Sequence, residues 1–255
     1  MVEFTGSGLP MSQAGMDAAS DAIGVKPAEM WAVISVETSG CGFLSDRRPK
    51  ILFERHVFSR LTGHRYDADN PDISQPTAGA YGRAGAHQYD RLAAALQLDE
   101  DAALNSASWG LGQIMGENYA AAGYATVAEM VAAMVASEDN QLRAMANFLK
   151  STGWDEPLRQ HDWAGFAGRY NGPDYAAHNY DRLLPQFYQR YSTGPLPDLR
   201  VRAVQVYLGY KGFSGVVVDG IAGPATSGAV MAFQASVGAA QTGTIDDALL
   251  AVLSA

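Results

Sequence analysis

Glu37 is the side chain whose setting most clearly suggests chemistry. It ends the apolar stretch MWAVISVE at residues 30–37, within a predicted helix that has Pro27 in its first turn and ends near Gly40. A carboxyl half-buried in the last helical turn loses hydration and meets the negative end of the helix dipole, and both effects raise its pKa. The position predicts a general acid working near neutral pH. The alternative is an ordinary helix-end glutamate in a salt bridge.

Two further segments follow Glu37 in a defined order. The first is SASWGLGQIM at residues 106–115, and the second is RYNGP at residues 169–173. Each segment alone is a weak signal, and the second by itself is typical of a plain turn. In this order and spacing, the three resemble the glutamate, G-L-x-Q-I and Y-N-x-G motifs of the superfamily of goose-type lysozymes and soluble lytic transglycosylases.

A longer resemblance covers nearly all of residues 12–191. The segments VETSGCGF, RPKILFERHVFSRLTG, SASWGLGQIMGENY and WAGFAGRYNGPDYAAHNYD are similar to the phage endolysin family described as N-acetylmuramidase, which has a large lysozyme-like domain. The resemblance implies that Glu37 is the catalytic acid. It also implies that Ser108 and the residues from Gly110 to Gln113 line the sugar groove, and that Tyr170 and Asn171 bind substrate beside the scissile linkage. Glu54, Trp109 and Met115 are further candidates for the groove or for positions directly behind it.

These residue types suit the cleavage of a glycosidic bond. The leaving oxygen needs a proton donor, the sugar passes through an oxocarbenium-like state, and amide and hydroxyl groups can hold the neighbouring N-acetyl sugars. Glycine lets a sugar approach the backbone closely. The expected reaction is hydrolysis of the β-1,4 bond between N-acetylmuramic acid and N-acetylglucosamine, and the alternative is a lytic transglycosylase that forms a 1,6-anhydro product.

A second catalytic carboxylate is not evident from the spacing. The candidates are Glu54, Asp67, Asp69 and Asp72, and Glu54 in ILFERH is expected to be structural or to line the groove. A rival wall peptidase would need the lone Cys41 paired with His56 or His87. A lone cysteine is usually a small buried hydrophobe, so this rival is disfavoured. A non-catalytic wall-binding or virion structural protein is the alternative of another class.

The C-terminal segment resembles the common three-helix peptidoglycan-binding module. LRVRAVQVYL at residues 199–208, VDGIAGPAT at 218–226 and AFQA at 232–235 carry the match, with Phe233 as a core anchor. The threonine-tryptophan pair expected near the end is replaced by Ala248 and Leu249. We therefore expect a catalytic domain at 1–193, a linker at 194–198 and a binding module at 199–255.

The elements that must position these residues are mainly helical. Amphipathic periodicity and capping residues predict helices at 12–23, 27–40, 49–61, 88–98, 99–107, 126–136, 138–150, 163–170 and 179–191, with three more in the module. Residues 65–83 are rich in Gly, Pro, Asp and Asn and predict an irregular excursion that holds at most a small ribbon.

Composition narrows the function classes. The net charge is −9, and no block of Lys or Arg occurs, which argues against nucleic acid as a partner. One cysteine and five histidines without zinc spacing predict neither a disulfide nor a metal, and no cofactor is expected. The sequence shows no signal peptide and no membrane-spanning run. We expect a monomer that stays in the host cytoplasm until a separate holin-like pore admits it to the cell wall.

Overall fold

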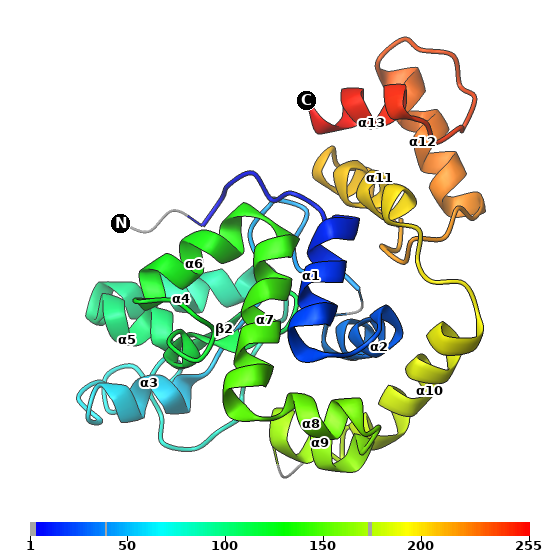
Figure 1. The fold of residues 1–255 in the computed structure, drawn as a ribbon. Helices are drawn as coiled ribbons and strands as arrows, with labels where there is room; N and C mark the ends of the chain where they lie inside the picture. Colours follow the sequence, from blue (N-terminus) through cyan, green and yellow to red (C-terminus); the bar gives the residue numbers. More distant parts are fainter. Residues whose placement is uncertain (1–3, 39, 173–174) are drawn as a thin grey trace.

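The computed structural model describes residues 4–38, 40–172 and 175–255. The motif residues Ser39, Pro173 and Asp174 fall outside the described residues. A helical body carries a smaller helical module at one end (Figure 1). The mainly α class expected from the sequence is confirmed. No helix in the described ranges combines the length and apolarity needed to cross a membrane.

The body is built from ten α-helices in the described ranges, most of which begin and end within a few residues of the predicted limits. One of them, α8, was not predicted. Their bounds are α1 Gln13–Ile23, α2 Pro27–Thr38, α3 Arg55–Leu61, α4 His87–Leu98, α5 Glu100–Asn105, α6 Val127–Ala136, α7 Glu138–Thr152, α8 Asp155–Arg159, α9 Trp163–Tyr170 and α10 Tyr180–Thr193, with a short 3-10 helix η1 at Gly116–Asn118.

Helix α2 runs through the interior of the body. Ser12 caps α1 by accepting a hydrogen bond from the Gly15 amide at 3.0 Å, and a left-handed Gly24 ends that helix before Pro27 starts α2. Most of α2 is buried, because α10 packs against it and α1 packs against both α2 and α7. The sequence of α2 is apolar on all sides for this reason.

A small antiparallel sheet packs against α4, α5 and α7. It consists of β1 (Ile51–Phe53), β2 (Ala107–Trp109) and β3 (Ile114–Met115) in that order. Its register pairs Ile51 with Trp109 and Ser108 with Met115. The prediction for residues 49–61 was wrong, because they begin with a strand rather than with a helix. Residues 65–83 form turns without any strand, in agreement with the predicted irregular excursion.

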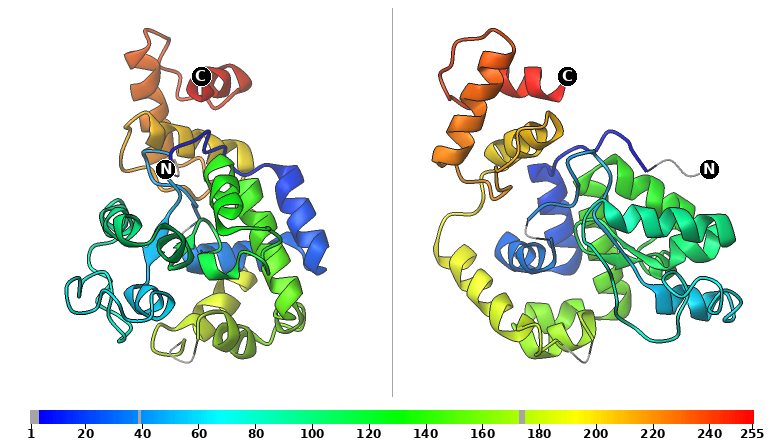
Figure 2. Two further views of the ribbon diagram at one scale, coloured as in Figure 1. Left: turned by 90° about the vertical axis from the view of Figure 1, so that its left-hand side faces the viewer. Right: turned by 180° about the vertical axis from the view of Figure 1, so that it is seen from behind.

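The C-terminal module consists of α11 (Leu199–Tyr210), α12 (Pro224–Ser236) and α13 (Asp247–Ser254). Asp198 caps α11 by accepting from the amides of Arg200 and Val201. The predicted anchor Phe233 is buried with Leu208 and Leu253 in a core of the module's own. Helices α10 and α11 flank residues 194–198, as the two views in Figure 2 show.

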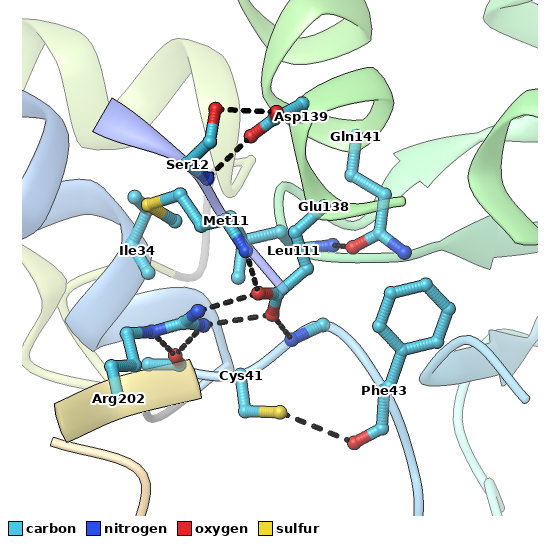
Figure 3. Close-up of polar contacts among 12 residues, drawn as sticks. Met11, Ser12, Ile34, Cys41, Phe43, Leu111, Glu138, Asp139, Gln141 and Arg202 are labelled. Atoms are coloured by element: carbon cyan, nitrogen blue, oxygen red, sulfur yellow. Dashed lines mark hydrogen bonds and ion pairs between the residues drawn. The ribbon is translucent and has the colours of Figure 1, made fainter. Parts of the chain in front are cut away.

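Helix α11 also docks on the body through a buried ion pair. Arg202 on α11 and Glu138 at the start of α7 have no exposed side-chain surface, and two nitrogen–oxygen distances of 2.5 and 2.7 Å join them. Arg202 also donates to the carbonyl of Gly40, while Glu138 accepts from the amides of Met11 and Gly42 (Figure 3). The module is therefore fixed to the chain that follows Glu37.

Candidate active site

Glu37 lies in the last turn of α2, as predicted. Because most of the preceding residues of this helix are buried, its carboxyl emerges from the interior and is itself half-buried. Burial raises the pKa of Glu37 from 4.5 to about 7, and a hydrogen bond from Asn171 opposes that rise. The carboxyl therefore holds a proton close to neutral pH, as a general acid requires.

A pocket of about 370 Å³ opens beside Glu37. Its sides come from the end of α2, β1 and the chain leading into it, the two residues that follow the excursion, and the turn between β2 and β3. Among its described lining residues, Glu37 is the one carboxylate. The lining residues are Glu37, Thr38, Leu44, Lys50, Ile51, Leu52, Ala84, Gly85 and Gln113.

Gln113 lies on one side of this pocket in an unusual backbone conformation. Its φ of 47° is in the left-handed region, which a residue with a side chain rarely adopts. Its side-chain Nε2 donates to the carbonyls of Gly110 (2.8 Å) and Lys50 (3.2 Å), and its Oε1 accepts from Ser108 Oγ at 2.8 Å. These bonds fix the β2–β3 turn to β1, and a strained residue held this way is typical of functional sites.

Gly110 is required for the same turn. Its φ is 69°, and a Cβ at this position would lie 2.6 Å from the side chain of Gln141. Gln141 Oε1 accepts from the next amide, that of Leu111, at 2.8 Å. A side chain at Gly110 would therefore displace the contact that holds the turn to α7.

Tyr170 and Asn171 approach Glu37 from the end of α9. Asn171 Nδ2 donates to Glu37 Oε1 at 2.7 Å, and the Tyr170 hydroxyl donates to the carbonyl of Gly112 at 2.5 Å. Burial and the nearby Glu37 carboxylate raise the pKa of Tyr170, so this hydroxyl stays protonated. The structure thus brings together three segments, around residues 37, 110 and 170, whose order along the chain suggested a common site.

Among the predicted groove residues, Gln113 lines the Glu37 pocket itself, and three others have different surroundings. Trp109 is fully buried, with its indole nitrogen donating to the carbonyl of Leu104 at 3.2 Å, so it offers no face to a sugar in the groove. Met115 is half-buried on β3, opposite Ser108. Glu54 precedes α3 and does not line the Glu37 pocket; burial raises its pKa, and His56 Nδ1 lies 3.2 Å from its Oε2.

Asp67 and Cys41 have structural surroundings, whereas the candidate acids Asp69 and Asp72 are exposed. Asp67 accepts from the hydroxyls of Ser59 and Ser74, and these bonds lower its pKa, so it remains ionised. Cys41 is buried, its thiol donates to the carbonyl of Phe43 at 3.4 Å, and burial raises its pKa. A thiol in this state is a poor nucleophile, which argues against the peptidase alternative.

Two residues near Glu37 were missed by the sequence analysis. Lys50 lines the pocket, and its ammonium donates to the Thr38 carbonyl at 2.8 Å. Tyr180 begins α10, and burial, with a further contribution from the Glu37 carboxylate, raises the pKa of its hydroxyl. The one sequence signal that could have identified either residue was the position of Lys50, directly before the apolar strand ILF.

A half-buried acid at the end of an apolar helix, a pocket beside it and a small three-stranded sheet define a lysozyme-like glycoside hydrolase. The family described as N-acetylmuramidase matches residues 26–192, and one described as a putative peptidoglycan binding domain matches residues 198–253. The chain belongs to the N-acetylmuramidase family. It is an endolysin-type glycoside hydrolase that acts on bacterial peptidoglycan and carries a peptidoglycan-binding module.

Solved structures support the same assignment. The chain shares 39% sequence identity with the Burkholderia AP3 phage endolysin, and its fold matches the crystal structure of that endolysin with a TM-score of 0.66. The match covers 72% of this chain and 71% of that chain. No curated protein matches the chain. These comparisons favour neither the transglycosylase nor the non-catalytic alternative.

Proposed function

We propose that Glu37 is the catalytic acid of this muramidase. The observation that carries the proposal is a carboxyl with a pKa raised to about 7, which faces a pocket and is held by Asn171. Below that pH the carboxyl is protonated and can donate to the oxygen that leaves the muramyl sugar. As the bond breaks, positive charge develops on the sugar ring, and the new Glu37 carboxylate stabilises it.

Water completes the reaction by attacking the sugar carbon, which gives a reducing N-acetylmuramic acid end. Glu37 is the one carboxylate among the described pocket residues, so it is the group best placed to take the proton of that water. If the 6-hydroxyl of the sugar attacked instead, the product would be an anhydro sugar.

The predicted groove residues have two proposed tasks. Asn171 and Tyr170 hold Glu37 and the adjoining turn, since they bond to the Glu37 carboxylate and to the Gly112 carbonyl. Gln113 lines the side of the pocket that contacts the sugar, and Ser108 and Gly110 shape the turn that carries it. Support comes from the strained backbone at Gln113 and from the side-chain bonds that fix it.

Mass spectrometry of fragments from purified peptidoglycan tests this proposal. The unmodified chain should release muropeptides with reducing N-acetylmuramic acid ends. Glu37→Gln should lower the rate at least about a hundredfold while its circular dichroism stays unchanged, because the amide cannot donate the proton. Retained turnover in a folded Glu37→Gln variant would contradict the assignment, and fragments lighter by one water would indicate a transglycosylase.

The delivery of the enzyme is a separate proposal. We propose that the monomeric chain remains in the host cytoplasm until a holin-like pore opens the membrane, and the similarity to a phage endolysin supports this order of events. Expression with and without a pore protein tests the order, and lysis without one would contradict it. Light scattering of the purified chain tests whether it is a monomer in solution.

A further inference from the structure

A second pocket lies between the body and the binding module. Its volume is about 380 Å³. One side consists of residues from the loop 41–50, and the other consists of residues from α11 and from the segment 212–218 that follows it. Neither part of the protein forms this pocket alone.

The second pocket adjoins the Glu37 pocket. Leu44 and Lys50 line both of them. The loop that carries these two residues is a tight hairpin. The backbone amide of Lys50 donates to the Gly42 carbonyl at 2.7 Å, and the backbone amide of Leu44 donates to the Arg48 carbonyl at 2.8 Å. A ligand in the Glu37 pocket therefore needs to pass only this hairpin to reach the second pocket.

The lining of the second pocket has a simple chemistry. Lys50 is the one charged side chain among its described lining residues. The rest of the lining combines apolar side chains, such as Phe43, Val206 and Val218, with neutral polar ones, such as Gln205. The Lys50 ammonium gives one hydrogen bond to Thr38, so it has further donors for a ligand. A short chain with a carboxylate and small apolar side groups fits this combination.

The two sides of the second pocket are held in a fixed relation. The buried pair Arg202–Glu138 joins α11 to α7, and Arg202 also holds the Gly40 carbonyl at the start of the loop (Figure 3). Val206 of α11 packs against Cys41 and Phe43 in a buried cluster. The pocket is therefore already formed before a ligand arrives, which lowers the entropic cost of binding.

We propose that this second pocket binds the acidic stem peptide of the muramyl sugar held in the Glu37 pocket. The proposal rests on the proposed function, because it places a muramyl sugar beside Glu37. In peptidoglycan the stem peptide is attached to that sugar and carries free carboxylates, and Lys50 pairs with one of them. The binding module thus forms part of the substrate site as well as a tether to the cell wall.

Calorimetric titration of the full-length protein tests this inference. Two probes are used, the disaccharide N-acetylglucosaminyl-N-acetylmuramic acid with its stem tetrapeptide, and the same disaccharide without it. Neither contains the bond that a muramidase cleaves, so the result does not depend on the role of Glu37. The peptide form should bind roughly tenfold more tightly, the size expected for one hydrogen bond to a charged group.

Two neighbouring valines provide a matched pair of variants. Val216 lines the second pocket, whereas Val217 is 65% exposed and does not line it. Val216→Trp should abolish the difference in Kd between the two probes, and Val217→Trp should preserve it. Ser45→Trp narrows the pocket from the opposite side and should reproduce the effect of Val216→Trp, so a folding defect in one variant does not decide the outcome.

Three results would overturn the inference. They are equal Kd values for the two probes in the unmodified protein, an equal weakening of both probes by Val216→Trp and Ser45→Trp, and loss of the difference in Val217→Trp. Failure of the proposed function would appear separately, as an anhydro product or as retained turnover in Glu37→Gln.

Discussion

Arg202 and Glu138 form a salt bridge with no exposed side-chain surface on either partner, and it joins the binding module to the catalytic body. The Glu138 carboxylate also accepts two backbone amides, and the pKa of this buried group stays below its ordinary value because Arg202 and these bonds offset burial. A charge pair in such a place costs much desolvation energy and is stable only when every polar atom has a partner. Loss of one partner therefore affects both parts of the protein.

Replacement of Arg202 should strongly destabilise the protein. Arg202→Met leaves the Glu138 carboxylate buried without its cation, and we expect a loss of about 3 to 5 kcal/mol in the free energy of unfolding. The matched control is Arg200→Met on the same helix, because Arg200 forms an exposed ion pair with Asp247 and should cost less than about 1 kcal/mol. Urea unfolding measures both, and equal losses would contradict the prediction.

Removal of the module should impair more than attachment to the cell wall. A fragment of residues 1–193 lacks the groups that cover Glu138, Cys41 and the Gly40 carbonyl. We expect it to unfold at lower urea concentration and to cleave solubilised peptidoglycan more slowly than the full chain. A fragment with full stability and full activity on that substrate would show that the two parts act independently.

Much of the fold could be predicted from local signals. Ser12 and Thr126 cap helices where the sequence indicated, because a cap depends on neighbours within a few residues. The strands were missed, since each has two or three residues and Ile51 pairs with Trp109 far along the chain. Such pairing leaves no local periodicity to detect.

The candidate site likewise combines residues that local motifs predict with residues that only tertiary packing brings into place. Glu37 and Asn171 could be proposed because each belongs to a motif, and the structure places them in contact. Arg202 could not, because in LRVRAVQVYL it resembles any solvated helix charge, and only docking of the module buries it. The contribution of Lys50 to two adjoining pockets likewise depends on how distant segments pack.

Glu37 should lower the stability of the protein at alkaline pH. Its pKa is about 7 in the folded protein and near 4.5 in the unfolded chain, so the folded state binds more protons between these values and stability falls as the pH rises through that window. Glu37→Gln should therefore be more stable than the unmodified protein by about 3 kcal/mol at pH 8 and equally stable at pH 4. Urea unfolding at both pH values checks this, and a difference that persists at pH 4 would point to another cause.

Asn171 should tune the pH range of activity. Its hydrogen bond lowers the pKa of Glu37, so Asn171→Ala should raise that pKa and move the alkaline limb of the kcat/KM profile to higher pH. The rate at the optimum should fall as well, because the acid is no longer held in place. Asn147→Ala is the control, since the Asn147 side chain also donates a hydrogen bond, but to the Ala122 carbonyl instead of to Glu37. An alkaline limb that does not shift in Asn171→Ala would contradict the prediction.

The buried contact between α11 and the start of α7 limits how this enzyme can be recombined with others. Exchange of cell-wall-binding modules between lytic enzymes assumes that each module is an interchangeable part. Here a foreign module without an arginine in register with Glu138 would leave a buried carboxylate uncompensated. Functional chimaeras of this enzyme should therefore transplant both sides of the interface, or neutralise residue 138 when a new module is attached.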